Sequence, residues 1–252
     1  MITVDREGSL VRDYKAEYEG RIKFIKDMLS TSGAAGIVFG NSGGKDSALV
    51  GILCKAACEN TVGIIMPCAS KRNYGQDAED GRELAEKYGI ETRVVDLTQV
   101  RERELAELEK VCTPNDAALT NIAPRLRMTT LYAVGASENR LVAGTGNRSE
   151  IYMGYFTKWG DGGSDFNPIA DLTATEVFEF LEYLGAPRSI IDKAPSAGLF
   201  DGQTDEQEMG VTYKAIDDYL LYGTVNDRDK AIIDRYHSRS EHKRRPIATY
   251  QG

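Results

Sequence analysis

The stretch GNSGGKDS, at residues 40–47, decides the fold, because an apolar segment precedes it and an apolar-periodic helix follows it directly. Residues 34–39 (AAGIVF) have the continuous apolar character of a strand buried on both faces of a parallel sheet. Residues 48–56 place apolar side chains at helical spacing. The paired glycines let backbone N–H groups approach an oxyanion, and the helix N-terminus adds partial positive charge. The stretch therefore predicts a phosphate-binding loop.

Two common phosphate loops do not match this stretch. A Walker A motif requires Ser or Thr after its lysine, but Asp46 follows Lys45. A dinucleotide fingerprint requires G-x-G-x-x-G, which neither this loop nor residues 144–146 (GTG) supplies. The loop instead resembles the S-G-G-x-D-S signature of the N-type ATP pyrophosphatases. An aspartate beside polyphosphate is repulsive without a bridging divalent cation, so Asp46 indicates Mg²⁺. The alternative is a Gly-rich turn with no ligand.

The length suffices for one sizeable α/β core and allows one or two domains, and the composition, with 41% apolar and 28% charged residues, is ordinary for a soluble globular protein. Because no linker separates two parts, we expect a single domain spanning residues 1–252. A net charge of −8 disfavours nucleic acid as a partner. No apolar run reaches the ~20 residues of a membrane span, and the first ten residues are too polar for a secretory signal. We therefore expect a cytoplasmic protein. Four cysteines without a C-x-x-C pair make a zinc or redox site improbable, and Cys54 and Cys58 are expected to be small core residues.

Strand and helix patterns alternate four times along the chain. Strands are predicted at residues 34–39, 61–66, 90–97 and 140–143. Helices are predicted at residues 11–29, 48–56, 77–88, 98–110, from Pro124 onward, and at 172–184, 213–221 and 227–236. This alternation predicts a doubly wound parallel sheet with helices on both faces and a helical C-terminal part, like that of the adenine nucleotide alpha hydrolases. Ligands then bind at the carboxyl ends of the strands.

Two segments lack any periodicity and are expected to be functional loops. Residues 155–168 (YFTKWGDGGSDFNP) are rich in Gly, Asp and aromatic residues. Residues 195–209 are rich in Gly, Asp and Gln, and we expect them to form a lid over bound nucleotide.

Five motifs together resemble the ammonia-dependent NAD synthetases, from the phosphate loop to the C-terminal basic tail. They are SGGKDS at 42–47, RLRM at 125–128, GTGNRSE at 144–150, FTKWGDGGSD at 156–165 and EHKR at 241–244. The resemblance implies that ATP adenylates the carboxylate of deamido-NAD with loss of pyrophosphate, and that ammonia then displaces AMP. It also implies Mg²⁺ as cofactor and a homodimer with the dinucleotide near the interface.

The resemblance assigns roles to individual residues. Contacts to ATP are expected from Gly40, Asn41, Ser42, Gly43, Gly44, Lys45, Asp46, Ser47, Thr145 and Ser196. Deamido-NAD is expected to be held by Lys158, Asp165, His242, Lys243 and either Arg125 or Arg127. Asp46 and Glu150 are expected to bind Mg²⁺, which makes Asp46 catalytic, and Asp161 is the catalytic candidate for positioning or deprotonating ammonia.

The chain departs from the family pattern at two positions. Many members carry a lysine, expected to touch the ATP phosphates, where this chain has Ala174. Lys45, in a loop position often filled by Gln, replaces that charge if its side chain turns toward the phosphates. Ser196 stands where Thr is usual, and it keeps the hydroxyl group.

Two other functions fit parts of the sequence. Another ATP pyrophosphatase with a different acceptor would share the loop, but the FTKWGDGGSD and EHKR motifs disfavour it. A nucleotide-binding sensor without turnover is disfavoured because Asp46 and Glu150 are both present.

The sequence predicts that free ammonia is the nitrogen donor. The 39 residues ahead of the loop hold about one helix and one strand and no cysteine, so a thiol-based glutaminase has no place there. NAD⁺ formation by the purified chain should rise with ammonium concentration, and with pH as the NH₃ fraction grows. Robust turnover with ammonium-free glutamine and no second protein would overturn this prediction.

Overall fold

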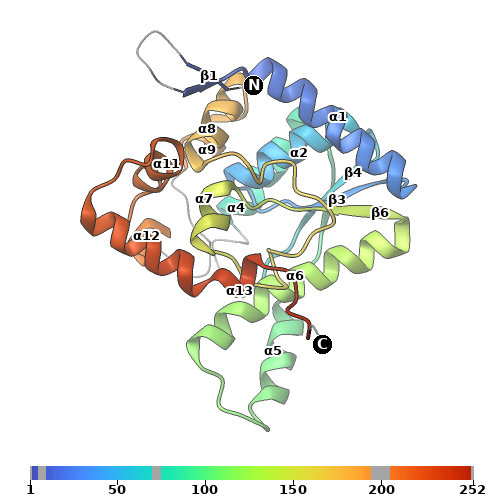
Figure 1. Cartoon of the computed structure of the whole chain (residues 1–252). Coiled ribbons are helices and arrows are strands. Elements are labelled where there is room, and N and C mark those ends of the chain that lie inside the picture. The colour runs from blue at the N-terminus through green and yellow to red at the C-terminus, as the bar shows by residue number, and fades with distance from the viewer. Residues whose placement is uncertain (1, 5–9, 70–74, 194–204, 251–252) are drawn as a thin grey trace.

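The central sheet confirms the predicted topology. The computed structural model describes residues 2–4, 10–69, 75–193 and 205–250. Four parallel strands lie in the order β5 (Glu91–Val94), β4 (Thr61–Ile65), β3 (Gly36–Gly40) and β6 (Arg140–Ala143) (Figure 1). The chain runs outward from β3 to β5 on one side and returns to pair β6 on the other. The strand order therefore reverses beside β3, where open α/β sheets bind ligands.

Helices cover both faces of this sheet because side chains alternate along each strand. Ile37 and Phe39 pack into a cluster with α1 (Tyr14–Ser32), α2 (Lys45–Ala57), α4 (Gln76–Tyr88) and α8 (Ala174–Tyr183). Val38, between them in β3, packs on the opposite face in the cluster that includes residues of α6 (Asp116–Glu138). Against α6 lies α5 (Thr98–Leu108). Because helices pack on both faces of the sheet, the side chains of β3 are apolar on both faces, and its sequence is a continuous apolar run.

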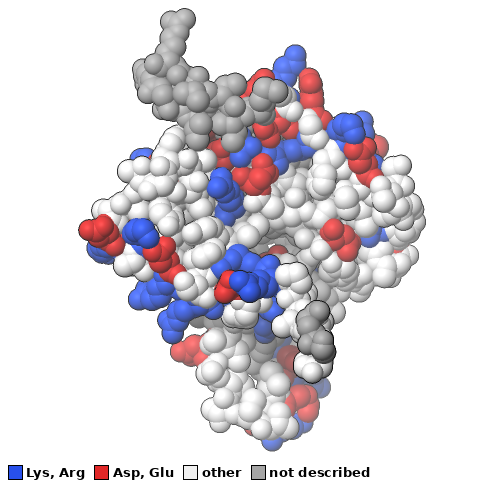
Figure 2. Space-filling model, in the orientation of Figure 1, with Lys and Arg blue, Asp and Glu red and all other residues white. Residues whose placement is uncertain are grey.

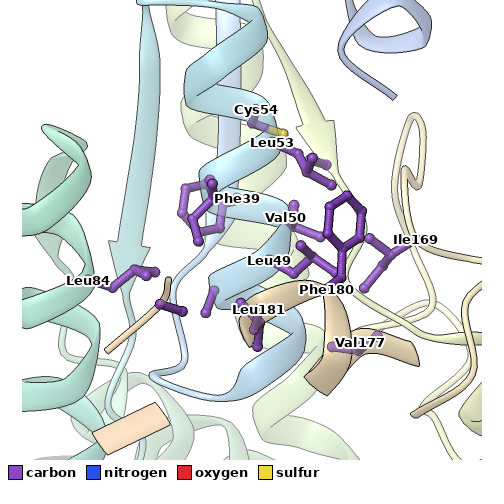
Figure 3. Close-up of a cluster of buried hydrophobic side chains, with 14 of the residues drawn as sticks. Phe39, Leu49, Val50, Leu53, Cys54, Leu84, Ile169, Val177, Phe180 and Leu181 are labelled. Carbon is purple, nitrogen blue, oxygen red and sulfur yellow. The ribbon is translucent and has the colours of Figure 1, made fainter. Parts of the chain in front are cut away.

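The largest apolar cluster is built around α2, which is the helix that follows the phosphate loop. Leu49, Leu53 and Phe180 are fully buried there with Phe39 (Figure 3). Cys54 is buried in the same cluster and Cys58 packs against it, which confirms the prediction for these two cysteines. All four cysteines are free. The core therefore fixes α2, and α2 in turn fixes the loop at its N-terminus.

A second group of helices forms the C-terminal part of the chain (Figure 1). It consists of α7 (Arg148–Met153), α10 (Asp205–Met209), α11 (Tyr213–Tyr222), α12 (Asp227–Arg239) and α13 (Glu241–Arg244), whereas α9 (Arg188–Ile191) packs against α2 and α8. Met153, Ile216 and Ile233 are fully buried in an apolar cluster of their own, which joins α7, α11 and α12. Among the residues that the structure describes, no helix is both long enough and apolar enough to cross a membrane.

Two predicted helix starts are wrong. The helix expected to open at Pro124 begins at Asp116, where the Asn115 side chain accepts the Ala118 N–H at 3.0 Å. Pro124 lies inside this helix and is buried, although proline there removes one backbone donor. At the N-terminus, residues 10–12 form β2 (Leu10–Arg12), which pairs with β1 (Ile2–Val4), and Asp13 caps α1 instead. In both cases a polar N-cap residue marks the start of the helix better than the proline or the apolar spacing does.

The segment expected to form a lid lies largely outside the described residues. Residues 195–204 belong to that part, so closure over nucleotide stays a prediction. Residues 205–209, expected to lack regular structure, form α10.

The central packing predicts the cost of a cavity. Replacing the fully buried Leu53 by alanine should lower the free energy of unfolding by about 2–5 kcal/mol, because the transfer free energy and the packing contacts are both lost. Val111 is 80% exposed, so Val111→Ala should change it by less than about 0.5 kcal/mol. Urea unfolding followed by circular dichroism measures both, and equal midpoints would contradict this account of the core.

Candidate active site

A cavity of about 1190 Å³ lies at the carboxyl ends of the central strands. Gly40 of β3, Ile65 of β4 and Ala143 of β6 end at its floor. The cavity therefore lies where the strand order predicts a ligand site. Its walls come from the phosphate loop, α6, α7, the 155–168 loop and α12 with α13.

The phosphate loop is held in shape by two serines and one positive φ angle. The Ser42 hydroxyl accepts the Gly44 N–H at 3.3 Å, and the Ser47 hydroxyl donates to the Gly44 carbonyl at 3.0 Å. Gly43 has φ +71°, and a Cβ there would lie 2.0 Å from the Asp77 carbonyl oxygen. Gly44, at the N-cap of α2, has no side-chain cap. The helix N-terminus is therefore left to an anionic ligand.

The predicted loop residues line the cavity with one exception. Those on its wall are Gly40, Asn41, Ser42, Gly44, Lys45, Asp46 and Ser47. Gly43 does not line the cavity; its carbonyl accepts a hydrogen bond from the Lys193 ammonium at 3.3 Å. Lys193 also pairs with Asp77 at 2.7 Å and with Asp80 at 2.6 Å, so it ties α4 to the loop. No local pattern indicates Lys193, because its partners lie far away in the chain.

Asn147 brings the two predicted metal ligands together. Its side-chain amide donates to Asp46 Oδ1 at 3.0 Å, and its backbone N–H donates to Glu150 Oε2 at 3.0 Å. Its side-chain oxygen accepts the Glu150 N–H at 3.0 Å, which completes a capping box at the start of α7. Asn147 is fully buried. The sequence analysis overlooked it, although Asn followed three residues later by Glu is a capping signal.

The carboxylate pair is electrostatically strained and partly neutralised by Lys45. Burial, followed by the charge of Asp46, raises the pKa of Glu150 far above its ordinary value. The Lys45 ammonium lies 2.5 Å from Asp46 Oδ2. Burial lowers the pKa of Lys45, but the nearby Asp46 and Glu150 carboxylates outweigh that effect and raise it above its ordinary value. Lys45 is therefore charged in this site.

The donor set suits Mg²⁺ that arrives with a nucleotide. Among the described residues, no group of three or more His, Cys, Asp or Glu side chains could hold a metal by itself. Mg²⁺ is commonly bound by one or two carboxylates, with phosphate oxygens and water completing its octahedron. Asp46 and Glu150, beside a phosphate loop, supply the protein's share of such a site.

A third acidic residue, Asp205, lies in the same wall of the cavity. It accepts a hydrogen bond from the Tyr213 hydroxyl at 3.1 Å, and the Tyr155 hydroxyl lies 3.4 Å from its other oxygen. Asp205 is 5% exposed and lines the cavity. The sequence analysis placed it in the expected lid and gave it no role.

The predicted substrate residues separate into two groups. Arg127 is half-buried in the cavity wall, where its Nε donates to the Met66 carbonyl at 3.1 Å and partial desolvation lowers its pKa. Arg125 is exposed outside the wall and contacts the Lys158 carbonyl. Lys158 in turn donates to the His242 carbonyl at 2.7 Å. The structure thus connects Arg125, Lys158 and His242, none of which lines the cavity, whereas Arg127 does.

The two predicted aspartates of the 155–168 loop differ in position. Asp161 lines the cavity, where its side chain is exposed, and it accepts the Thr157 N–H at 2.9 Å. Asp165 instead fastens the loop to the sheet, because it accepts the Tyr132 hydroxyl at 3.1 Å and the Val142 N–H at 2.8 Å. Thr145 and Glu150 also line the cavity, whereas Ser196 lies outside the described residues.

Basic side chains gather over α12 and α13 beside a hollow (Figure 2). Lys243 lines the cavity, and its ammonium donates to the carbonyls of Gly154 at 2.8 Å and Phe156 at 2.6 Å. The EHKR motif is therefore a docked helix. Arg235, Arg239 and Arg244 also line this side, although the sequence analysis did not name them. The signal for Arg235 and Arg239 was their four-residue spacing on one helix.

Lys45 extends toward the helix that carries Ala174. Its ammonium lies 5.6 Å from the ring centroids of both Phe178, one turn further along α8, and Tyr213. Ala174 and Tyr213 are buried in the same apolar cluster. The charge of Lys45 therefore reaches this side of the cavity, as compensation for Ala174 requires. Contact with phosphate stays a prediction.

Comparisons with known proteins agree on one family. The NAD synthase family model matches residues 17–251. An NH₃-dependent NAD⁺ synthetase from Carboxydothermus hydrogenoformans is 47% identical over 92% of this chain and 96% of its own. The structure of an NMN synthetase from Francisella tularensis superposes with a TM-score of 0.91 at 38% identity, over 96% of this chain and 100% of that one. An NH₃-dependent NAD synthetase from Campylobacter jejuni gives 0.78 at 29% identity, with the same coverage.

The loop geometry predicts different effects for its two glycines. Gly43→Ala should lower stability by about 1–2 kcal/mol or more, because alanine disfavours positive φ and its Cβ meets the Asp77 carbonyl. Gly44→Ala is the matched control, since φ is −95° and the nearest atom is the movable Ser42 hydroxyl at 3.3 Å. Thermal unfolding and ATP titration calorimetry compare the two variants. A Gly43→Ala protein as stable and as tight for ATP as Gly44→Ala would contradict the loop geometry.

Proposed function

The chain belongs to the NAD synthase family, and on that premise we propose that it makes NAD⁺ from deamido-NAD and free ammonia, with ATP as co-substrate. The observation that carries the proposal is the arrangement within one cavity of a phosphate loop, two carboxylates and a basic wall. The reaction needs these three parts. One binds the phosphates of ATP, one binds its metal ion, and one binds an anionic second substrate.

The first step is adenylation of the nicotinate carboxylate. A carboxylate oxygen attacks the α-phosphorus of ATP, and the bond to pyrophosphate breaks. The N–H groups of the loop and the N-terminus of α2 face the charge that develops on pyrophosphate. Asp46 and Glu150 hold Mg²⁺, which supplies further neutralising charge when bound. Asn147 keeps the two carboxylates in place, because it donates one hydrogen bond to each of them.

The second step is amide formation. Ammonia attacks the carbonyl carbon of the acyl adenylate, AMP leaves, and the nitrogen gives up one proton. Asp161 is the proposed group for positioning ammonia and accepting that proton, because it lines the cavity and its carboxylate is accessible there.

The second substrate is held from the basic side of the cavity. Arg127 and Lys243 line the wall and suit its phosphates and carboxylate, while Lys158 and His242, which contact each other, do not line it. Of the two candidate arginines, Arg127 is the better placed. We further propose a homodimer, as the family resemblance implies, and light scattering of the purified chain tests it.

A second candidate substrate is the mononucleotide, which would give NMN as product. The observation that favours it is the TM-score of 0.91 with the NMN synthetase, against 0.78 with the NAD synthetase. The activation chemistry is the same, because both substrates carry the nicotinate carboxylate. They differ in the adenylyl half, which a mononucleotide lacks.

One assay tests the reaction and the substrate together. The protein is incubated with ATP, Mg²⁺ and ammonium, with deamido-NAD in one reaction and deamido-NMN in the other. We expect AMP and NAD⁺, with the higher kcat/KM on the dinucleotide. ADP in place of AMP would refute the pyrophosphatase chemistry. AMP formation with a higher kcat/KM on the mononucleotide would instead support the second candidate.

The metal site predicts loss of turnover in two variants. Asp46→Asn and Glu150→Gln should each lower kcat by roughly 10²-fold or more, because each removes one carboxylate from the site of the catalytic metal. Glu182→Gln removes an exposed carboxylate on α8 and serves as the control. Circular dichroism should show that all three variants are folded. Near-normal activity in Glu150→Gln would remove Glu150 from the site.

A further inference from the structure

The ammonium of Lys45 occupies the position of a counter-ion to the proposed metal ligands. Its Nζ lies 2.5 Å from Asp46 Oδ2, and it interacts electrostatically with Glu150 and Asp205. The side chain is 6% exposed, so water gives it little screening. Rings of Phe178 and Tyr213 lie 5.6 Å away and cover it. The Lys45 ammonium is therefore a buried cation that the protein itself places among acidic side chains.

The hydrogen bonds around the pair bring the ammonium and a divalent cation to the same carboxylate. Asn147 already binds Asp46 Oδ1 and Glu150 Oε2. The other oxygen of Asp46 accepts the Lys45 ammonium. A divalent cation at that oxygen would lie within a few ångströms of the ammonium, and two like charges at that distance repel strongly. A metal ion on this oxygen and the Lys45–Asp46 ion pair therefore compete.

We propose that Lys45 is a positioning residue that neutralises Asp46 and Glu150 in the metal-free protein and competes with the divalent cation for them. The inference rests on the proposed function in one respect, namely that this cation is the Mg²⁺ that accompanies ATP. A displaced ammonium stays in the cavity beside the phosphate loop, where the acceptors are phosphate oxygens. Metal alone thus binds weakly, and metal with nucleotide binds tightly.

The competition is measured directly with Mn²⁺ as the probe. The free ion is quantified by electron paramagnetic resonance as it is titrated into the purified protein without nucleotide. Lys45→Met and Lys45→Gln should each bind Mn²⁺ about tenfold more tightly than the unsubstituted protein, because a buried positive charge beside the ion is removed. Lys45→Arg keeps the charge and should gain little. Lys243→Met is the matched control, because that lysine of the same cavity donates to backbone carbonyls.

Bound nucleotide should remove the difference in Mn²⁺ affinity between Lys45→Met and the unsubstituted protein. With a non-hydrolysable ATP analogue present, Lys45→Met should lose its advantage for Mn²⁺, because the unsubstituted protein then places its ammonium on phosphate. Thermal unfolding gives a second readout. Without metal Lys45→Met should melt lower than the unsubstituted protein, and Mn²⁺ should raise its melting temperature by more.

Two results would overturn the inference. One is an equal or weaker affinity of both uncharged variants for Mn²⁺ alone. The other is an equal gain in Lys243→Met, which would show a general effect of charge. A Lys45 variant that folds only when Mn²⁺ is added supports the inference. Without Mn²⁺, its carboxylates have neither the ammonium nor a metal ion beside them. These outcomes do not depend on the amide-forming assay, so a failure of the proposed reaction is distinguishable from a failure of this competition.

Discussion

The site depends on the hydrogen bonds of one buried asparagine, Asn147, which join the ends of two neighbouring strands. Asp46 follows β3 and Glu150 follows β6, and these strands pair in parallel. Their carboxyl ends therefore lie side by side, but adjacency alone does not orient two carboxylates that repel each other. Asn147 donates to both of them and caps α7 at the same time. The pairing of the two strands brings the carboxylates close together, and Asn147 orients them.

The cavity wall combines a basic part, which attracts anionic substrates, with an acidic part, which binds a cation. The chain carries a net charge of −8, yet one wall of the cavity is lined by basic residues of α12 and α13. The acidic pair lies in another part of the wall, against the phosphate loop and Lys45. Anionic substrates are thus attracted to one side, while the other side requires a cation before polyphosphate can bind. This division fits a reaction between two anions, ATP and a carboxylate.

Much of this arrangement was predictable because short stretches of the sequence determine it. The phosphate loop has an apolar strand on one side and an apolar-periodic helix on the other, and β6 was placed at its observed bounds. The failures have a physical cause as well. Pro124 was taken as a helix start, whereas burial in α6 outweighs its missing hydrogen bond. Lys193 acquires its position from tertiary packing with α4 and the phosphate loop, which no short pattern records. Asn147 was readable as a cap, but its bond to Asp46 spans 101 residues.

The central claim is that the carboxylate is activated by transfer of the adenylyl group, and oxygen transfer tests it most directly. Deamido-NAD labelled with ¹⁸O at both oxygens of its nicotinate carboxylate is converted with ATP, Mg²⁺ and ammonium, and the products are weighed by mass spectrometry. The account predicts one ¹⁸O in AMP and the other in the amide of NAD⁺, because the attacking oxygen leaves with AMP. Label in inorganic phosphate with unlabelled adenine nucleotide would contradict it.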